Sequence, residues 1–168
     1  MLSGLSKLYK YTGDDSLITA GQHLLDSVIA SSLVPSNNGI LVESCDPGGT
    51  CNQDQWMFKG VFFEHLGYFL SDIGNLQTVP VATRLALVQK YAGFVHTNAR
   101  AVWASRGSDG MVCSWWDAPS EAQRQVAVET QGSAVAALTC AVRMDKTLHS
   151  LQPSSIPPHQ LGTMTLED

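Results

Sequence analysis

About one third of the way along the 168-residue chain, one short segment carries most of the residues that can do chemistry. Gln53, Asp54, Gln55 and Trp56 are consecutive, and Lys59 follows three positions later. Carboxylate, amide and ammonium groups form hydrogen bonds with hydroxyls, and an indole ring offers a flat apolar face. Small polar groups beside an aromatic ring are typical of a site that holds a sugar. We therefore assign these five residues as candidate substrate-binding residues.

The same residues also have a purely structural interpretation. Asp54 stands where a helix N-cap is expected, so its carboxylate can accept hydrogen bonds from the amides of the first turn. Lys59 can reach back to Asp54, and Trp56 can pack beneath the loop instead of stacking on a sugar. Neither a cap nor a core explains the whole polar run, and both interpretations stay open at this point.

Trp115 and Trp116 form a second aromatic patch, in a segment that is typical of a loop. We expect one of the two indoles to line a groove and the other to pack inside. Glu43 and Asp46 precede the polar segment and are close enough in sequence to contact a sugar, but we interpret them as solvated loop charges. His65 falls on the apolar face of the predicted helix, which indicates a core histidine rather than a catalytic base.

Four cysteines are present, and two of them lie six residues apart. Cys45 and Cys51 flank a segment that contains a proline and two glycines, which suits a short disulfide loop. No Cys-x-x-Cys pair or paired histidine accompanies them, so the spacing does not indicate a zinc site. A disulfide in turn indicates a secretory route. Cys113 and Cys140 either pair with each other or remain free and buried.

The composition indicates one domain, or a part of a larger one, because 44% of the residues are hydrophobic. A net charge of -5 and the lack of a basic cluster argue against a nucleic-acid-binding protein. No apolar run approaches the ~20 residues that span a membrane. The first residues lack the charged lead and the apolar core of a signal peptide.

Hydrophobic periodicity predicts an all-α chain of about five helices with elaborated loops. The helices are expected over about residues 1–12, 16–33, 54–70, 80–105 and 120–144. The turn Thr12–Asp15 ends the first helix and caps the second. Residues 40–43 and 111–116 are expected to form short hairpin strands. Several prolines and few apolar residues predict a loosely held tail over 147–168, which leaves a domain over 1–146.

Four segments carry a resemblance to a known family: Leu8–Asp14, Gly39–Leu41, Cys51–Phe62 and Gln131–Ala134. The third contains Asp-Gln-x-x-Phe-Lys-Gly, which is the most specific of these motifs. Together they resemble glycoside hydrolase family 76, the endo-α-1,6-mannanases of bacteria and fungi. The resemblance covers the chain from its first residue to about Met144.

The resemblance implies an (α/α)6 barrel, of which these helices are about half. It implies retaining hydrolysis of α-1,6-linked mannan, or transfer of such glycans at a fungal cell wall, by two nearby carboxylates. In the family these are an adjacent Asp-Asp pair on an earlier helix, and the only such pair here, Asp14-Asp15, is interpreted as a helix cap. We therefore expect a truncated chain without its own catalytic residues, metal or cofactor, from a secreted or cell-surface protein.

A second class of function also fits the sequence. A chain without the catalytic pair can be a non-catalytic remnant that binds carbohydrate, or a helical scaffold fragment. Half of a barrel exposes the helix faces that would otherwise meet their neighbours, and such apolar patches promote aggregation. A scaffold alone leaves the polar cluster from Gln53 to Lys59 unexplained.

Overall fold

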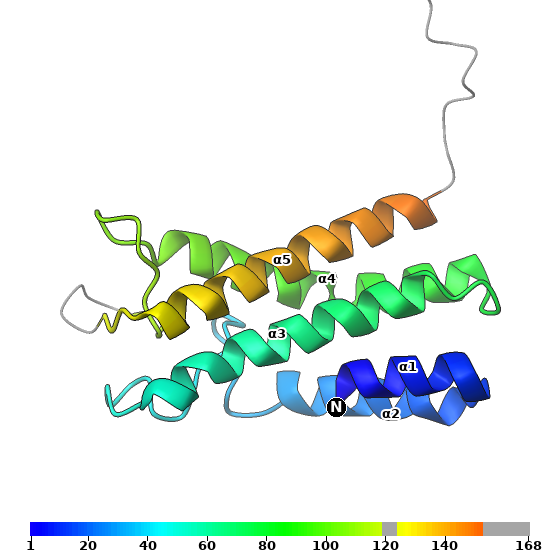
Figure 1. Ribbon diagram of the computed structural model, residues 1–168, viewed down its shortest axis with the longest axis horizontal. Coiled ribbons are helices and arrows are strands. Elements are labelled where there is room, and N and C mark those ends of the chain that lie inside the picture. The colour runs from blue at the N-terminus through cyan, green and yellow to red at the C-terminus, as the bar shows by residue number, and fades with distance from the viewer. Residues whose placement is uncertain (119–123, 153–168) are drawn as a thin grey trace, which may run out of the picture.

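The computed structural model describes residues 1–118 and 124–152, and in these residues the chain is all-α, as predicted. The helices are α1 (Leu2–Thr12), α2 (Asp15–Ile29), α3 (Gln53–Gly74), α4 (Val81–Ala104) and α5 (Val128–Leu151). Helices α1, α3 and α5 lie side by side in one layer, and α2 and α4 form a second layer behind them (Figure 1).

The connections between the helices are long at one end of the molecule and short at the other. The segment from α2 to α3 and the described parts of the segment from α4 to α5 lie at the end where α3 begins (Figure 1). The turns from α1 to α2 and from α3 to α4 lie at the opposite end. The fold therefore brings the polar segment at the start of α3 together with both long loops, and we call this region the loop end.

Two helix caps explain where α2 and α3 begin. Gly13 adopts a left-handed φ of 67° after α1, and Asp14 then caps α2 by accepting a hydrogen bond from an amide of its first turn at 2.9 Å. The cap predicted at Asp54 is wrong, because Asn52 is the N-cap of α3. Asn52 and Gln55 exchange two hydrogen bonds, of 2.8 and 3.0 Å, as a capping box.

Neither predicted hairpin strand forms in the described residues. In the segment 40–43, the backbone N–H of Leu41 donates to the side chain of Asn98 in α4 at 2.7 Å. This extended segment therefore packs on a helix instead of pairing with another strand. The segment 111–116 contributes only one isolated antiparallel bridge, between Arg106 and Val112.

Four predicted helix boundaries also shift. Helix α2 ends at Ile29, and α3 continues to Gly74. Helix α5 begins at Val128, where the hydroxyl of Thr130 accepts a hydrogen bond from the backbone N–H of Ala127 at 3.1 Å. It runs to Leu151, so the domain boundary predicted after residue 146 falls inside a helix. The prolines of the predicted tail lie outside the described residues.

Small residues set the distance between α3 and α5. Three glycines of α3 face three small residues of α5, all at seven-residue spacing: Gly60, Gly67 and Gly74 against Ser133, Cys140 and Thr147. A Cβ atom built on Gly60 would lie 2.5 Å from the Cα of Ser133, which is closer than any real contact. The matching order of the pairs shows that the two helices run parallel. Their backbones touch because these glycines have no side chain.

A polar cluster joins α1 to α3 in the same layer. The carboxylate of Asp72 accepts hydrogen bonds from Ser6 at 2.8 Å, Lys7 at 2.9 Å and Lys10 at 2.6 Å. Burial acts to raise the pKa of Asp72, but the hydrogen bonds from the two lysines and the serine outweigh it and lower the pKa. The cluster therefore holds α1 against α3 through a charged carboxylate.

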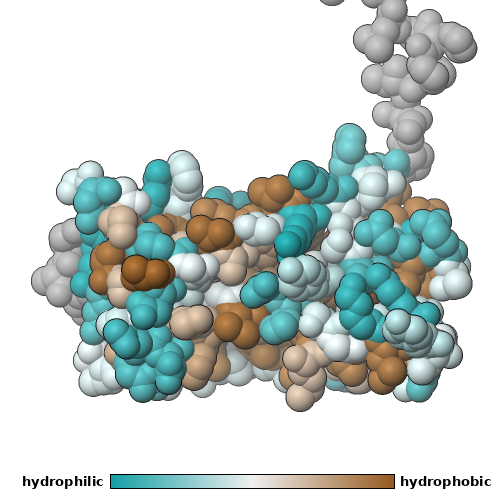
Figure 2. Space-filling view, viewed as in Figure 1, coloured by the Kyte–Doolittle hydropathy of each residue, from teal (hydrophilic) through white to brown (hydrophobic). Residues whose placement is uncertain are grey.

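Large apolar side chains remain exposed on the α3–α5 face of the first layer. Met57, Val61, Val128, Val135 and Val142 are between 43% and 84% exposed. Hydrophobic periodicity predicts four of them, Met57, Val61, Val135 and Val142, as inward-facing residues, and the structure contradicts this. Figure 2 shows this face with apolar patches over α3 and α5, interrupted by polar side chains. Within the residues that the structure describes, no helix has the length and apolarity to cross a membrane.

Candidate functional site

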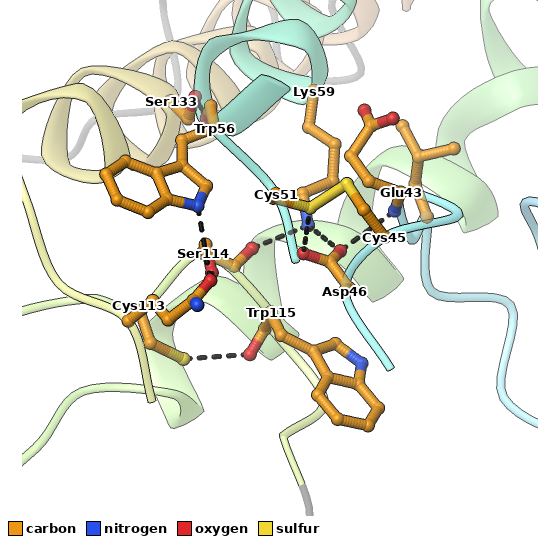
Figure 3. A network of polar contacts seen from close by, with 12 residues as sticks. Glu43, Cys45, Asp46, Cys51, Trp56, Lys59, Cys113, Ser114, Trp115 and Ser133 are labelled. Atoms are coloured by element: carbon orange, nitrogen blue, oxygen red, sulfur yellow. Dashed lines mark hydrogen bonds and ion pairs between the residues drawn. A yellow bond between two sulfur atoms is a disulfide. The ribbon is translucent and has the colours of Figure 1, made fainter. Parts of the chain in front are cut away.

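Lys59 lies at the centre of the loop end, completely enclosed by protein. Its side chain is 1% exposed, and its Nζ donates to the Asp46 carboxylate and to the Ser114 carbonyl, each at 2.5 Å (Figure 3). The same ammonium group lies 5.0 Å from the centre of the Trp116 ring. A buried cation needs a counter-ion and hydrogen-bond acceptors, and this lysine has both.

This arrangement corrects two predictions from the sequence. Lys59 does not reach back to Asp54, because its ammonium group is bound to Asp46 instead. Asp46 is only 4% exposed and is therefore not a solvated loop charge. An enclosed Lys59 also has no surface with which to touch a sugar.

A disulfide shapes the loop that carries Asp46. Cys45 and Cys51 are bonded, as the sequence predicted, and their Cα atoms lie 5.0 Å apart. Inside this loop Asp46 also accepts a hydrogen bond from the backbone N–H of Glu43 at 2.8 Å. The bridge therefore closes the loop around the one carboxylate that neutralises Lys59. Cys113 and Cys140 are both free and buried.

A second set of hydrogen bonds fastens the loop before α5 to the start of α3. Gln125 accepts a hydrogen bond from the Trp56 indole at 3.2 Å and donates one to the carbonyl of Gly49 at 2.7 Å. Its backbone carbonyl accepts from the backbone N–H of Ser114 at 2.8 Å. The loops around residues 46, 114 and 125 are thus linked to one another and to the start of α3.

The two adjacent tryptophans of the second aromatic patch have different environments. Trp116 is 3% exposed and packs against Phe63 with ring centres 5.6 Å apart, which confirms that one indole of the pair packs inside. Trp115 is partly exposed, and its ring is turned away from Lys59 (Figure 3). Of the pair, only Trp115 offers a ring surface to a ligand.

The first turn of α3 presents the remaining candidates. Gln53 and Asp54 are exposed, while Trp56 is partly buried and its indole N–H is bonded to Gln125. The side-chain carbonyl of Gln55 is part of the capping box with Asn52. Gln55 therefore has a structural role, and Gln53 and Asp54 are the polar groups that point outward from this turn.

The Asp14-Asp15 pair lies at the opposite end of the molecule from Asp54. Asp14 caps α2, and the hydrogen bond from Ser16 lowers its pKa. Helix α3 separates the two ends, and its 22 residues span ~33 Å at 1.5 Å per residue. The pair cannot act on a sugar bound at the loop end.

No resident metal site is evident at the loop end. Across the described ranges, no group of three or more His, Cys, Asp or Glu side chains is placed to hold a metal ion. The structure shows loops held together by hydrogen bonds around one buried ion pair, in which Lys59 and Asp46 neutralise each other. This arrangement can present polar groups and one indole to a ligand that carries many hydroxyls.

The pKa of the Glu43 carboxyl is shifted by its surroundings, and this shift yields a pH-dependent prediction. Burial raises the pKa of Glu43, Lys59 acts to lower it, and Asp46 acts to raise it further. The folded state therefore holds this proton more tightly than the unfolded state. The associated stability is present below the unfolded pKa of ~4.3 and is lost as the pH rises through the raised folded pKa.

Glu43→Gln is accordingly expected to raise the midpoint of thermal unfolding at neutral pH and to leave it unchanged below the ordinary glutamate pKa. Circular dichroism at the two pH values measures the difference. Glu64→Gln, on the exposed side of α3, is the matched control and should have little effect at either pH. An equal gain for Glu43→Gln at both pH values would contradict a role for its charge.

Reasoning from the sequence missed two important residues of this site. Asp46 was identifiable as the one carboxylate inside the predicted disulfide loop, 13 residues before a lysine that needs a partner. Gln125 gave no comparable signal, because its partners Trp56 and Gly49 lie more than 60 residues away in the chain.

Comparisons with known proteins agree with this structure. The family model for Glycosyl hydrolase family 76 matches residues 1–151. A Candida albicans protein, mannan endo-1,6-alpha-mannosidase DCW1, is 35% identical over 120 residues, which are 70% of this chain and 25% of that protein. A Schizosaccharomyces pombe protein, provisionally named a mannan endo-1,6-alpha-mannosidase, is 32% identical over 114 residues, which are 68% and 24% of the two chains.

The chain thus spans about a quarter of the length of the curated relatives it matches. No solved structure matches it. The two all-helical layers agree with part of the α/α barrel that the resemblance implied. On the match over nearly all of its described residues, the chain belongs to glycoside hydrolase family 76.

Proposed function

We propose that this chain forms one wall of a groove that binds α-1,6-linked mannan, as part of a mannan endo-1,6-α-mannosidase. The observation that carries the proposal is the loop end. There, a buried Lys59–Asp46 pair supports Trp115, and the first turn of α3 presents Gln53 and Asp54. An indole can stack on the C–H face of a mannose ring while the polar side chains bond its hydroxyls. The two relatives, both named for this activity, support the choice of sugar.

Retaining hydrolysis needs two carboxyl groups close together, one as nucleophile and one as acid and base. Asp14 and Asp15 are excluded by their distance from the loop end and by the capping role of Asp14. We therefore infer that the catalytic carboxylates come from a part of the enzyme outside this matched quarter. Whether water or a second glycan accepts the mannosyl group then depends on that part.

The disulfide indicates the compartment in which the protein acts. A Cys45–Cys51 bridge forms readily in the oxidising secretory route, and mannan is an extracellular polymer in the proposed setting. We therefore propose that the enzyme acts outside the cell or in the cell wall. Because Asp14 caps α2, it also supports a second candidate function for the chain by itself, namely binding of mannan without hydrolysis.

Calorimetric titration of the chain with an α-1,6-mannooligosaccharide tests the proposal. Trp115→Ala should weaken binding about tenfold, because a stacking contact contributes about 1.5 kcal/mol at most and 1.4 kcal/mol corresponds to a factor of ten. Asp54→Ala should also weaken it. Tyr11→Ala, which removes an exposed aromatic at the opposite end of the molecule, is the control and should bind like the unmodified chain.

The same titration can refute the proposal. Absence of binding by the unmodified chain, or equal affinities of Trp115→Ala and Tyr11→Ala, would remove the loop end as a mannan site. Release of reducing ends by the chain alone would show that it holds its own catalytic carboxylates, and it would return Asp14 and Asp15 to consideration.

A further inference from the structure

We propose that Lys59 is a positioning residue, which fixes the loop 111–118 and thereby aims the ring of Trp115, while making no contact with sugar itself. The role of Lys59 in sugar binding rests on the proposed function. Its effect on the loop rests only on the contacts that Lys59 makes.

The first step is the burial of the lysine. A side chain that is 1% exposed cannot meet a ligand at the surface, so a direct role in binding is excluded. Its ammonium group instead joins two segments that are far apart in sequence, through the Asp46 carboxylate and the Ser114 carbonyl. Lys59 lies in the second turn of a 22-residue helix, and a group on a helix is positioned more precisely than a group on a loop.

The second step is the position of the atom that Lys59 holds. The carbonyl of Ser114 belongs to the peptide bond that leads into Trp115. The N–H of Ser114 is bonded to the carbonyl of Gln125 at 2.8 Å, so both polar backbone groups of this residue are engaged. On the far side, the carbonyl of Trp115 accepts a hydrogen bond from Ala118 at 3.1 Å. Hydrogen bonds therefore hold the backbone on either side of the indole, and this sets the direction in which the partly exposed side chain leaves the loop.

The third step separates positioning from bulk stability. Exchanging a buried ion pair for uncharged groups of similar volume is often neutral for stability, whereas losing one partner alone strands a charge. The double variant Lys59→Met/Asp46→Asn keeps both side-chain volumes and strands no charge. It still removes the cation that held the Ser114 carbonyl, so it tests the link to Trp115 without unfolding the chain.

The experiment uses the full chain labelled with 5-fluorotryptophan and observed by ¹⁹F NMR. The sequence contains four tryptophans, and single Trp→Phe variants assign their resonances. Trp116 touches Lys59 and will respond directly, so the diagnostic signal is that of Trp115. In Lys59→Met/Asp46→Asn we expect the Trp115 resonance to shift or broaden and the resonance of Trp103, on α4, to stay in place. The control Lys90→Met/Asp26→Asn removes a solvent-exposed pair and should move neither resonance.

Affinity for an α-1,6-mannooligosaccharide is measured on the same samples. We expect it to fall about tenfold in Lys59→Met/Asp46→Asn, to the level of Trp115→Ala, with no change in the control. An unmoved Trp115 resonance would overturn the positioning role. A shifted Trp115 resonance with unchanged affinity would overturn the role of Lys59 in sugar binding. If the unmodified chain does not bind the sugar at all, the proposed function fails, and the NMR result still decides whether Lys59 positions Trp115.

Discussion

Gly60→Ala is expected to lower the free energy of unfolding by about 3 kcal/mol, the upper part of the usual range for an overpacked core. The new Cβ would lie 2.5 Å from the Cα of Ser133 and 2.7 Å from its Oγ. Backbone cannot move aside as a flexible side chain can, so α3 and α5 must separate. Separation also lengthens the 2.6 Å hydrogen bond from Ser133 to the carbonyl of Trp56. A domain is stable by only about 5–15 kcal/mol, so this is a large fraction of the total.

Urea unfolding followed by circular dichroism measures this change. Gly93→Ala is the matched control, because Gly93 is also inside a helix but a Cβ added there would meet no atom within 4 Å. There, alanine should stabilise the chain by about 0.5–1 kcal/mol through its better helix propensity. If both alanine variants behave alike, the contact between α3 and α5 is not as close as the structure shows.

Asp46→Ala is expected to cost about 3–5 kcal/mol, because it leaves the Lys59 ammonium buried without its counter-ion. The loss should exceed that of an ordinary hydrogen bond, since the desolvated charge stays behind. Urea unfolding followed by circular dichroism measures this loss.

Two comparisons make the Asp46→Ala result specific. Lys90→Met removes one partner of an ion pair that is about half exposed, and such pairs contribute only about 0–1 kcal/mol. Adding Lys59→Met to Asp46→Ala should recover part of the lost stability, because the stranded charge is then gone. A double variant that is less stable than Asp46→Ala alone would show that Lys59 stabilises the loop end through other contacts.

Local signals in the sequence predicted the parts of the fold that depend on neighbouring residues. Gly13 and Asp14 form the turn between α1 and α2 because a left-handed residue followed by a capping carboxylate is a local pattern. The Cys45–Cys51 bridge was predictable for the same reason, since only six residues separate the two. Helix α4 begins after Pro80, where its fixed φ suits the start of a helix.

The prediction failed at one local helix cap and at contacts between residues that are distant in the sequence. Asp54 was a reasonable N-cap by residue type, but Asn52 has an amide partner at the spacing that a capping box needs. The partner of Lys59 is Asp46, which reaches it through the fold and not along a helix. Met57 and Val61 have helical spacing and apolar side chains, yet they are exposed because periodicity does not say which helix face has a neighbour.

The burial of the two free thiols also bears on whether they can exchange with the Cys45–Cys51 disulfide. Cys113 and Cys140 are each 1% exposed, and burial raises the pKa of Cys140 to about 12. Thiol–disulfide exchange requires a thiolate that can reach the sulfur it attacks, and the folded protein presents none from Cys140. Scrambling of the Cys45–Cys51 bridge by this thiol is therefore confined to chains that have not yet folded. Once the helices have packed, burial of the Cys140 thiol keeps it from exchanging with the bridge.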